Sequence, residues 1–158
     1  MKHLILIRHA ESAEKVTGTS DEQRELTLGG VHQAAQVGAF LRSKIHVDII
    51  FSSRANRAQT TAQIIAEQLS LDAEDVILQD DLYQASVGTL YNIIRDADQY
   101  QNIAVVAHNP TISYFSEFIT DSDVDEMRPA SVLILKVDVG NWKDIQKGSA
   151  AVLDRFDA

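Results

Sequence analysis

Two arginines and two histidines in this 158-residue chain could act together on a phosphoryl group: Arg8, His9, Arg57 and His108. A guanidinium group presents forked donors that match the oxygens of a phosphate. An imidazole near its reference pKa of about 6.5 is largely unprotonated at neutral pH and can serve as a nucleophile or a base. These residue types therefore indicate an anion-binding site with its own nucleophile, provided that the fold brings them together.

Short apolar segments precede several of these residues and predict buried strands. Arg8 and His9 directly follow the first segment, which does not alternate and is therefore consistent with a strand covered on both faces. His108 directly follows the segment that most resembles a buried strand. We expect strands at residues 3–7, 48–51, 76–78, 103–107 and 132–137, with an edge strand at 152–156.

Between these predicted strands lie segments whose apolar residues have helical spacing. Thr27 is expected to cap the first helix, Ser53 the second, and Asn109 the last, with Pro110 at that helix's first position. The first helix would bury the apolar positions Leu28, Val31, Ala35, Gly38 and Leu41. We expect the later helices at residues 54–69, at 87–98 and from 110 onward.

The alternation of strands and helices predicts an α/β fold with a mainly parallel sheet, formed by one domain over residues 1–158. Ligands of such sheets bind just beyond the carboxyl ends of the strands. The four cationic or imidazole side chains would meet at that edge, where the helix after Asn109 also directs its N-terminal amides. The polar segment 11–26 is expected to form a loop on the rim.

Composition narrows the classes of partner. The formal charge of −9 argues against nucleic-acid or anionic-membrane binding, which needs a basic face. No apolar run approaches the ~20 residues that span a bilayer, and Leu4–Ile7 is shorter than the roughly 7–15 residues of a secretory signal. The absence of cysteine excludes disulfides and thiolate chemistry. We expect a cytoplasmic protein that catches an anionic substrate with a few converging cations.

Four motifs, in order along the chain, resemble those of the histidine phosphatase superfamily, which has the phosphoglycerate-mutase-like fold. Residues 7–11 (IRHAE) are similar to the family's Arg-His-Gly/Ala opening, and residues 26–34 (LTLGGVHQA) to its Leu-Thr-x-x-Gly-x-x-Gln-Ala segment. Residues 52–62 (SSRANRAQTTA) resemble Ser-Ser-x-x-x-Arg-Ala-x-x-Thr-Ala, and residues 107–110 (AHNP) the second histidine motif. The compact length most resembles the short SixA-type branch, whose members act as phosphohistidine phosphatases.

This resemblance implies a three-layer α/β/α sandwich without a cap domain, and catalysis without a metal or other cofactor. His9 would accept the phosphoryl group, and water would then hydrolyse the phosphohistidine intermediate. Arg8 and Arg57 would hold the phosphate, while His108 would stabilise charge on its oxygens in the transition state. Asn109 would join these three in binding the substrate. The partner would be a phosphorylated protein or a small phosphorylated molecule.

One departure from the family bears on the substrate. Ester-cleaving members usually carry a glutamate after the third strand as general acid, whereas this chain has Gln84, which cannot protonate a leaving group. The nearby Asp80 and Asp81 are interpreted as exposed loop carboxylates. An imidazole leaves far more easily than an alkoxide, so the missing acid favours phosphohistidine on a protein. A small-molecule phosphomonoesterase that uses Asp81 or water as acid, and a catalytically weak phospho-ligand binding module, stay open.

Two sequence patterns suggest metal binding, but each lacks residues that a metal site needs. Residues 121–125 begin like a calcium-binding EF-hand loop, but Glu126 stands where the loop needs glycine and Val132 where it needs glutamate. His9 and His108 have no third ligand at suitable spacing, and the two arginines would repel a cation. We therefore expect no metal site.

Overall fold

The computed structural model describes residues 1–158, and its centre is a six-stranded sheet with the order β3-β2-β4-β1-β5-β6. The first four strands run parallel, whereas β5 and β6 pair antiparallel with their neighbours. The strands are β1 (Lys2–Arg8), β2 (Ile49–Ser52), β3 (Val76–Leu78), β4 (Asn102–Ala107), β5 (Ser131–Val137) and β6 (Ala150–Asp157). The prediction of a mainly parallel sheet with a C-terminal edge strand is confirmed.

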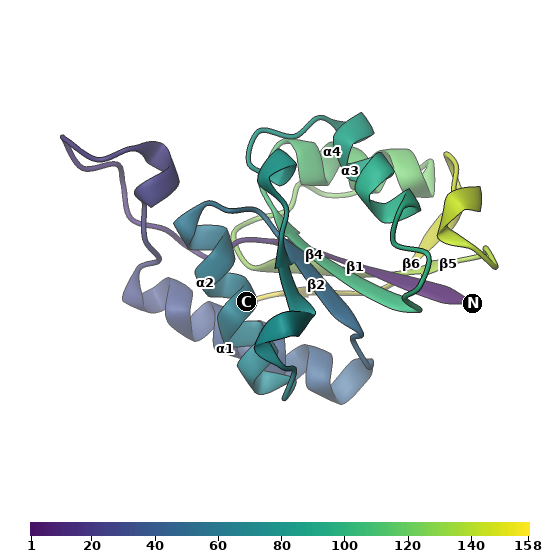
Figure 1. Ribbon diagram of the computed structural model, residues 1–158, viewed down its shortest axis with the longest axis horizontal. Coiled ribbons are helices and arrows are strands. Elements are labelled where there is room, and N and C mark those ends of the chain that lie inside the picture. Colours follow the sequence, from purple (N-terminus) through teal and green to yellow (C-terminus); the bar gives the residue numbers. More distant parts are fainter.

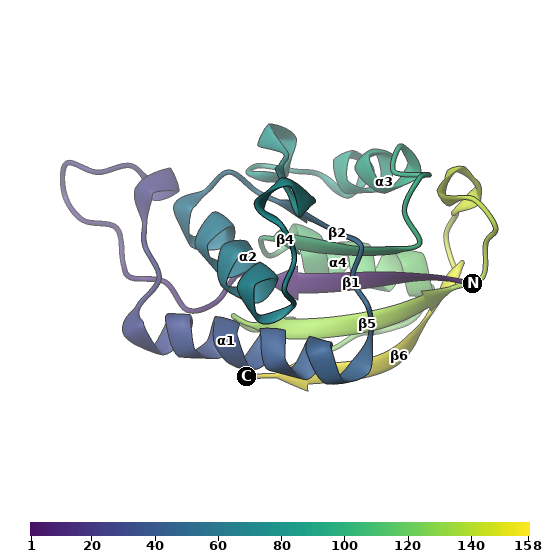
Figure 2. The same cartoon turned by 60° about the horizontal axis from the view of Figure 1, so that its bottom comes forward.

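Two helical layers enclose the sheet. The helices α1 (Leu28–Lys44) and α2 (Asn56–Gln68) cover one face, and α3 (Val87–Arg95) and α4 (Thr111–Thr120) cover the other (Figures 1 and 2). This is the three-layer sandwich expected from the sequence, and no cap domain is inserted. None of the four helices combines the length and the apolarity that crossing a membrane requires.

The apolar run of β1 has no alternation because both of its faces are buried. Leu4 and Leu6 pack into the core under α3 and α4, whereas Ile5 and Ile7 pack into the core under α1 and α2. Successive side chains of a strand point to opposite faces, so a strand between two helical layers needs apolar residues at every position.

Strand register brings the chain segments that follow β1, β2 and β4 to one edge. β4 lies between the other two, with Arg8 opposite Ala107 and Ser52 opposite Val106. The backbone N–H of His9 donates to the carbonyl of Ala107 at 3.1 Å, so the pairing continues one residue past β1. Residues that come directly after these three strands therefore lie side by side.

The buried face of α1 differs from the one expected. Leu28 is 76% exposed and Val31 is 38% exposed, so these two predictions are wrong. A Cβ atom on Gly30 would lie 2.1 Å from the carbonyl oxygen of Glu11, and one on Gly38 would lie 2.5 Å from a side-chain carbon of α2. The glycines thus let α1 pack closely, and their positions set its inner face. The buried residues are Gly30, Ala34, Val37, Gly38 and Leu41.

Two of the three predicted helix caps are wrong. Thr27 does cap α1, because its hydroxyl oxygen accepts a hydrogen bond from the N–H of Gly30 at 3.0 Å. Ser53 does not cap α2, which begins at Asn56 with Ala55 in the capping position. The hydroxyl of Ser53 is bound instead within the site described below.

Asn109 is not the cap of α4, and Pro110 is not its first residue. The helix begins at Thr111 with Pro110 in the capping position, after a cis peptide bond between Asn109 and Pro110. The Asn109 side chain is engaged elsewhere: its oxygen accepts from the Ser113 hydroxyl at 2.6 Å, and its nitrogen donates to the carbonyl of Met127 at 2.7 Å.

Candidate active site

Arg8, His9, Arg57 and His108 lie around one cavity of about 410 Å³ at the carboxyl edge of the sheet. His9 and Arg57 are buried, with 7% and 6% of their surfaces exposed. The two imidazole rings are 5.2 Å apart between centroids. The structure therefore brings together the four residues that were predicted from separate strand ends. The remaining lining residues are Glu11, Ser12, Asp21, Arg24, Tyr83, Gln84, Asn109 and Pro129.

His9 lines this cavity, and the unprotonated nitrogen of its ring is Nε2. The Nδ1 atom lies 2.8 Å from the carbonyl oxygen of Ala10, and a carbonyl only accepts, so Nδ1 carries the proton. Burial first, and then the charges of Arg57, Arg8 and Arg24, lower the pKa of His9 to about 4, against the opposing effect of this hydrogen bond. The ring is consequently neutral at physiological pH, with its lone pair on Nε2.

Ser53 fixes the opposite tautomer in His108. The hydroxyl oxygen of Ser53 accepts from the N–H of Ala55 at 3.2 Å and lies 2.7 Å from Nε2 of His108. Burial first, and then the repulsion that two protonated rings would exert on each other, lower the pKa of His108 to about 3, so its ring is neutral. The Ser53 hydroxyl has no other acceptor and donates its proton to Nε2. The proton of His108 therefore sits on Nδ1, as a donor.

We expect Ser53→Ala to lower kcat about tenfold, because it leaves Nε2 of His108 buried without a partner. The proton of the His108 ring is then no longer fixed on Nδ1. The mutant should also show a mixture of tautomers in the ¹⁵N NMR spectrum of the His108 ring. Ser52→Ala is the matched control, since its equally buried hydroxyl donates to the backbone carbonyl of Ser53 and touches no imidazole. A kcat unchanged by Ser53→Ala would contradict this role.

Protein oxygens hold both outer nitrogens of Arg57 and one outer nitrogen of Arg8. Arg57 donates through Nη1 to the carbonyl of Asp21 at 2.8 Å and through Nη2 to its carboxylate at 3.1 Å. Arg8 donates through Nη1 to the carbonyl of Met127 at 3.1 Å. The Nε atoms of both arginines and Nδ1 of His108 are buried and have no protein partner. Arg8, Arg57 and His108 line the same cavity, and two guanidinium groups beside an imidazole make a site for an anion's oxygens.

The loop over residues 11–26 contributes a group that the sequence did not assign. The Asp21 carboxylate accepts from the Tyr83 hydroxyl at 2.7 Å and from Nη1 of Arg24 at 3.0 Å. The hydrogen bond from Tyr83 is the largest of the causes that hold the pKa of Asp21 well below its usual range. Asp21 is therefore ionised, and it orients Arg57 from the side of the loop, which extends from the end of β1 in Figure 1.

No acidic side chain stands where the family's esterases carry their glutamate. Gln84 lines the cavity, whereas Asp81 lines a different one on the other side of the turn 80–82. The carboxylates of the site itself are those of Asp21 and of Glu11, which accepts from the Thr27 hydroxyl at 2.7 Å. The cavity is consequently rich in cationic donors, and both of its carboxylates already accept hydrogen bonds from protein hydroxyls.

Residues 4–93 match the sequence profile of the histidine phosphatase superfamily (branch 1), and the chain belongs to that superfamily. It is 33% identical over 160 residues to the uncharacterized protein Rv1276c of Mycobacterium tuberculosis, a match that covers 93% of this chain and 96% of that protein.

Solved structures show the same fold. A SixA protein of Agrobacterium tumefaciens superposes with a TM-score of 0.86 at 21% identity, covering 99% of this chain and 98% of that one. The protein histidine phosphatase SixA complexed with tungstate superposes with a TM-score of 0.82 at 17% identity, covering 97% and 95%. The whole chain thus has the fold of the short, capless members.

Proposed function

We propose that this protein is a phosphatase that works through a phosphohistidine intermediate on His9 and removes phosphoryl groups from histidine side chains of a protein. The observation that carries the proposal is the neutral His9 ring, whose lone pair is on Nε2, in one cavity with the side chains of Arg8, Arg57 and His108. A neutral nucleophile and a fixed set of cationic donors are the two requirements of phosphoryl transfer.

The reaction has two displacements at phosphorus. In the first, Nε2 of His9 forms a bond to phosphorus, the bond to the leaving nitrogen breaks, and the leaving imidazole takes a proton from solvent. In the second, water attacks phosphorus, the bond to Nε2 breaks, and inorganic phosphate leaves. Arg8, Arg57 and Nδ1–H of His108 hold the phosphoryl oxygens in both transition states, where charge develops on them. The fixed guanidinium charges supply the electrostatic stabilisation.

The choice of phosphohistidine depends on the leaving group. An alkoxide needs a positioned acid, whereas an imidazole can leave with a proton from solvent. Gln84 cannot supply such a proton, and Asp81 does not line this cavity. The likeness of the fold to a protein histidine phosphatase also supports this substrate class. The same argument disfavours a sugar phosphatase, and a binding module would not need a nucleophile.

The test offers three substrates to the protein in the presence of EDTA: a phosphohistidine-bearing protein, a sugar phosphate and an aryl phosphate. We expect turnover of the first and the third, because both have good leaving groups. Preference for the sugar phosphate would favour the phosphomonoesterase, and binding of phosphate without turnover of any substrate would favour the binding module. Either result would overturn the proposal.

The ionisation of His9 gives a further expected result. Because its pKa is lowered to about 4, the ring should stay neutral as the pH falls from about 7 to 5, and should take up a proton only near pH 4. Loss of the nucleophile therefore should not limit activity in mildly acidic solution. A ¹⁵N NMR titration of the His9 ring measures this directly. Protonation near the reference value of about 6.5 would show that the ring is not desolvated.

A further inference from the structure

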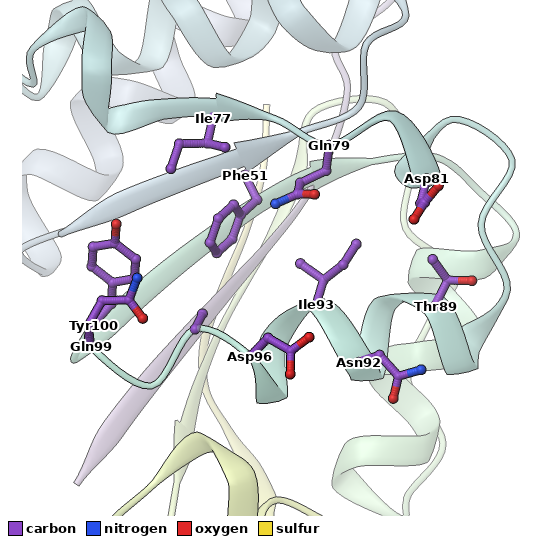
Figure 3. Close-up of a pocket in the computed structure, with 11 residues that line it drawn as sticks. Phe51, Ile77, Gln79, Asp81, Thr89, Asn92, Ile93, Asp96, Gln99 and Tyr100 are labelled. Atoms are coloured by element: carbon purple, nitrogen blue, oxygen red, sulfur yellow. The ribbon is translucent and has the colours of Figure 1, made fainter.

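A second cavity, of about 520 Å³, lies between α3 and the edge strand β3 (Figure 3). Its volume falls in the range of roughly 300–1,000 Å³ typical of ligand sites. Phe51 from β2 and Ile93 from α3 point into it, and Ile77 of β3 completes an apolar floor. Polar groups surround this floor: Gln79, Asp81, Thr89, Asn92, Asp96 and Gln99. The cavity is therefore an amphipathic groove along the edge of the sheet, which we call the β3–α3 groove.

The charge of the β3–α3 groove has one sign. Asp81 and Asp96 are exposed, and no lysine or arginine lines the groove. Neither carboxylate takes part in an ion pair of the protein. Asp96 also stands at the C-terminal cap of α3, where the helix dipole adds negative potential instead of offsetting it. The groove is complementary to a cation.

The apolar floor specifies what kind of cation fits. A lysine or arginine side chain has an apolar stem and a charged end, and such side chains cover apolar surface while the charge reaches outward. Phe51, Ile77 and Ile93 match the stem, and Asp81 and Asp96 match the charged end. A small inorganic cation would leave the floor unused. The groove is therefore complementary to a basic segment of polypeptide.

A single turn joins the β3–α3 groove to the catalytic cavity. Asp81 lies in the 3₁₀ helix Asp80–Leu82 and lines the groove. Tyr83 follows this turn, lines the catalytic cavity and lies 5.8 Å from the His108 ring between centroids. A polypeptide with one residue in the catalytic cavity can thus continue across the turn into the groove.

We propose that the β3–α3 groove docks a lysine- or arginine-bearing segment of the phosphorylated protein while its phosphohistidine enters the catalytic cavity. This inference rests on the proposed function and adds a preference for basic sequence around the phosphohistidine. Solvent-exposed ion pairs are individually weak, so the groove should change the apparent affinity for the protein substrate and leave the chemical step alone.

The test compares three substrates: a phosphohistidine peptide flanked by lysines, the same peptide flanked by glutamates, and free phosphohistidine. The wild-type protein should have a lower KM for the lysine peptide than for the glutamate peptide. Asp96→Lys should raise the KM of the lysine peptide about three- to tenfold with little change in kcat, and should leave free phosphohistidine unaffected. Asp81→Lys should act in the same direction, and added salt should weaken the wild-type preference.

Asp138→Lys is the matched control, because it makes the same charge change at an exposed residue just after β5, at the sheet edge opposite the catalytic cavity. Equal KM values for the two peptides with wild-type protein, or an equal effect of Asp138→Lys, would overturn the groove proposal alone. An effect of Asp96→Lys on free phosphohistidine would overturn it too, by revealing a general structural change. If wild-type protein hydrolyses none of the three substrates, the proposed function itself is wrong, and the groove has no phosphorylated substrate to dock.

Discussion

His9→Ala should reduce turnover of an aryl phosphate or a phosphohistidine protein on the order of 10⁴-fold or more, since it removes the atom that forms the bond to phosphorus. The alanine protein should still bind inorganic phosphate, because the donors of Arg8, Arg57 and His108 remain. Rapid acid-free quenching of the wild-type reaction should trap a phosphorylated chain, and mass spectrometry should locate the phosphoryl group on His9. No such species should form with the variant.

The control for this result is His46→Ala, which removes an imidazole whose side chain is 79% exposed and which precedes β2, at the amino ends of the parallel strands. It should leave kcat unchanged. Thermal unfolding of both variants separates a catalytic loss from a folding defect. Turnover that survives His9→Ala would mean that water attacks the substrate directly, and the two-step mechanism would be wrong.

Arg57→Ala should cost on the order of 10³-fold in kcat, the lower end for an arginine that stabilises a phosphoryl transition state. Two effects act together. The variant loses the guanidinium charge, and it also leaves the Asp21 carboxylate, which Arg57 now holds through Nη2 at 3.1 Å, facing an anionic substrate. Arg57→Lys should not restore the rate, because an ammonium group cannot bind Asp21 and a phosphoryl oxygen through a fixed fork.

Arg42→Ala removes the same charge from an exposed position at the end of α1 and should change kcat by less than about twofold, as a surface substitution away from the site. Steady-state kinetics with an aryl phosphate measures both variants, and circular dichroism checks that the Arg57 variants remain folded. A loss of less than tenfold in Arg57→Ala would place this residue outside the transition-state contacts.

The sequence was sufficient to find His9 and His108 because a parallel sheet leaves little freedom at the ends of its strands. Once the apolar runs are recognised as neighbouring strands, the residues that follow them must share an edge. Arg57 lies within the first turn of the helix after β2, so the same argument extends to it. The sheet and the helical layers were predictable for a related reason, since burial on both faces imposes an apolar pattern that can be recognised without coordinates.

Other parts of the site depend on contacts that have no periodic signal. Asp21 reaches Arg57 from a loop, and only the local spacing of Asp21 and Arg24 hints at an ion pair there. Ser53 has the residue type of a helix cap, yet in the structure its hydroxyl is bound to His108. The inner face of α1 is set by the close approach allowed at Gly30, and not by the largest apolar residues. Such contacts can be recognised only once the structure shows which residues distant in sequence lie close together.

The hydrogen bonds that hold the backbone around His9 affect how the free energy of substrate binding is used. The backbone of His9 and Ala10 is hydrogen-bonded to Ala107 of β4, to the Thr61 hydroxyl of α2 and to Ala130, the residue before β5. Ordering a mobile side chain at binding costs about 0.5–1.5 kcal/mol. Here that ordering is complete when the chain folds. The contacts that a substrate makes with this site are therefore available for lowering the reaction barrier, and none is needed to assemble the machinery.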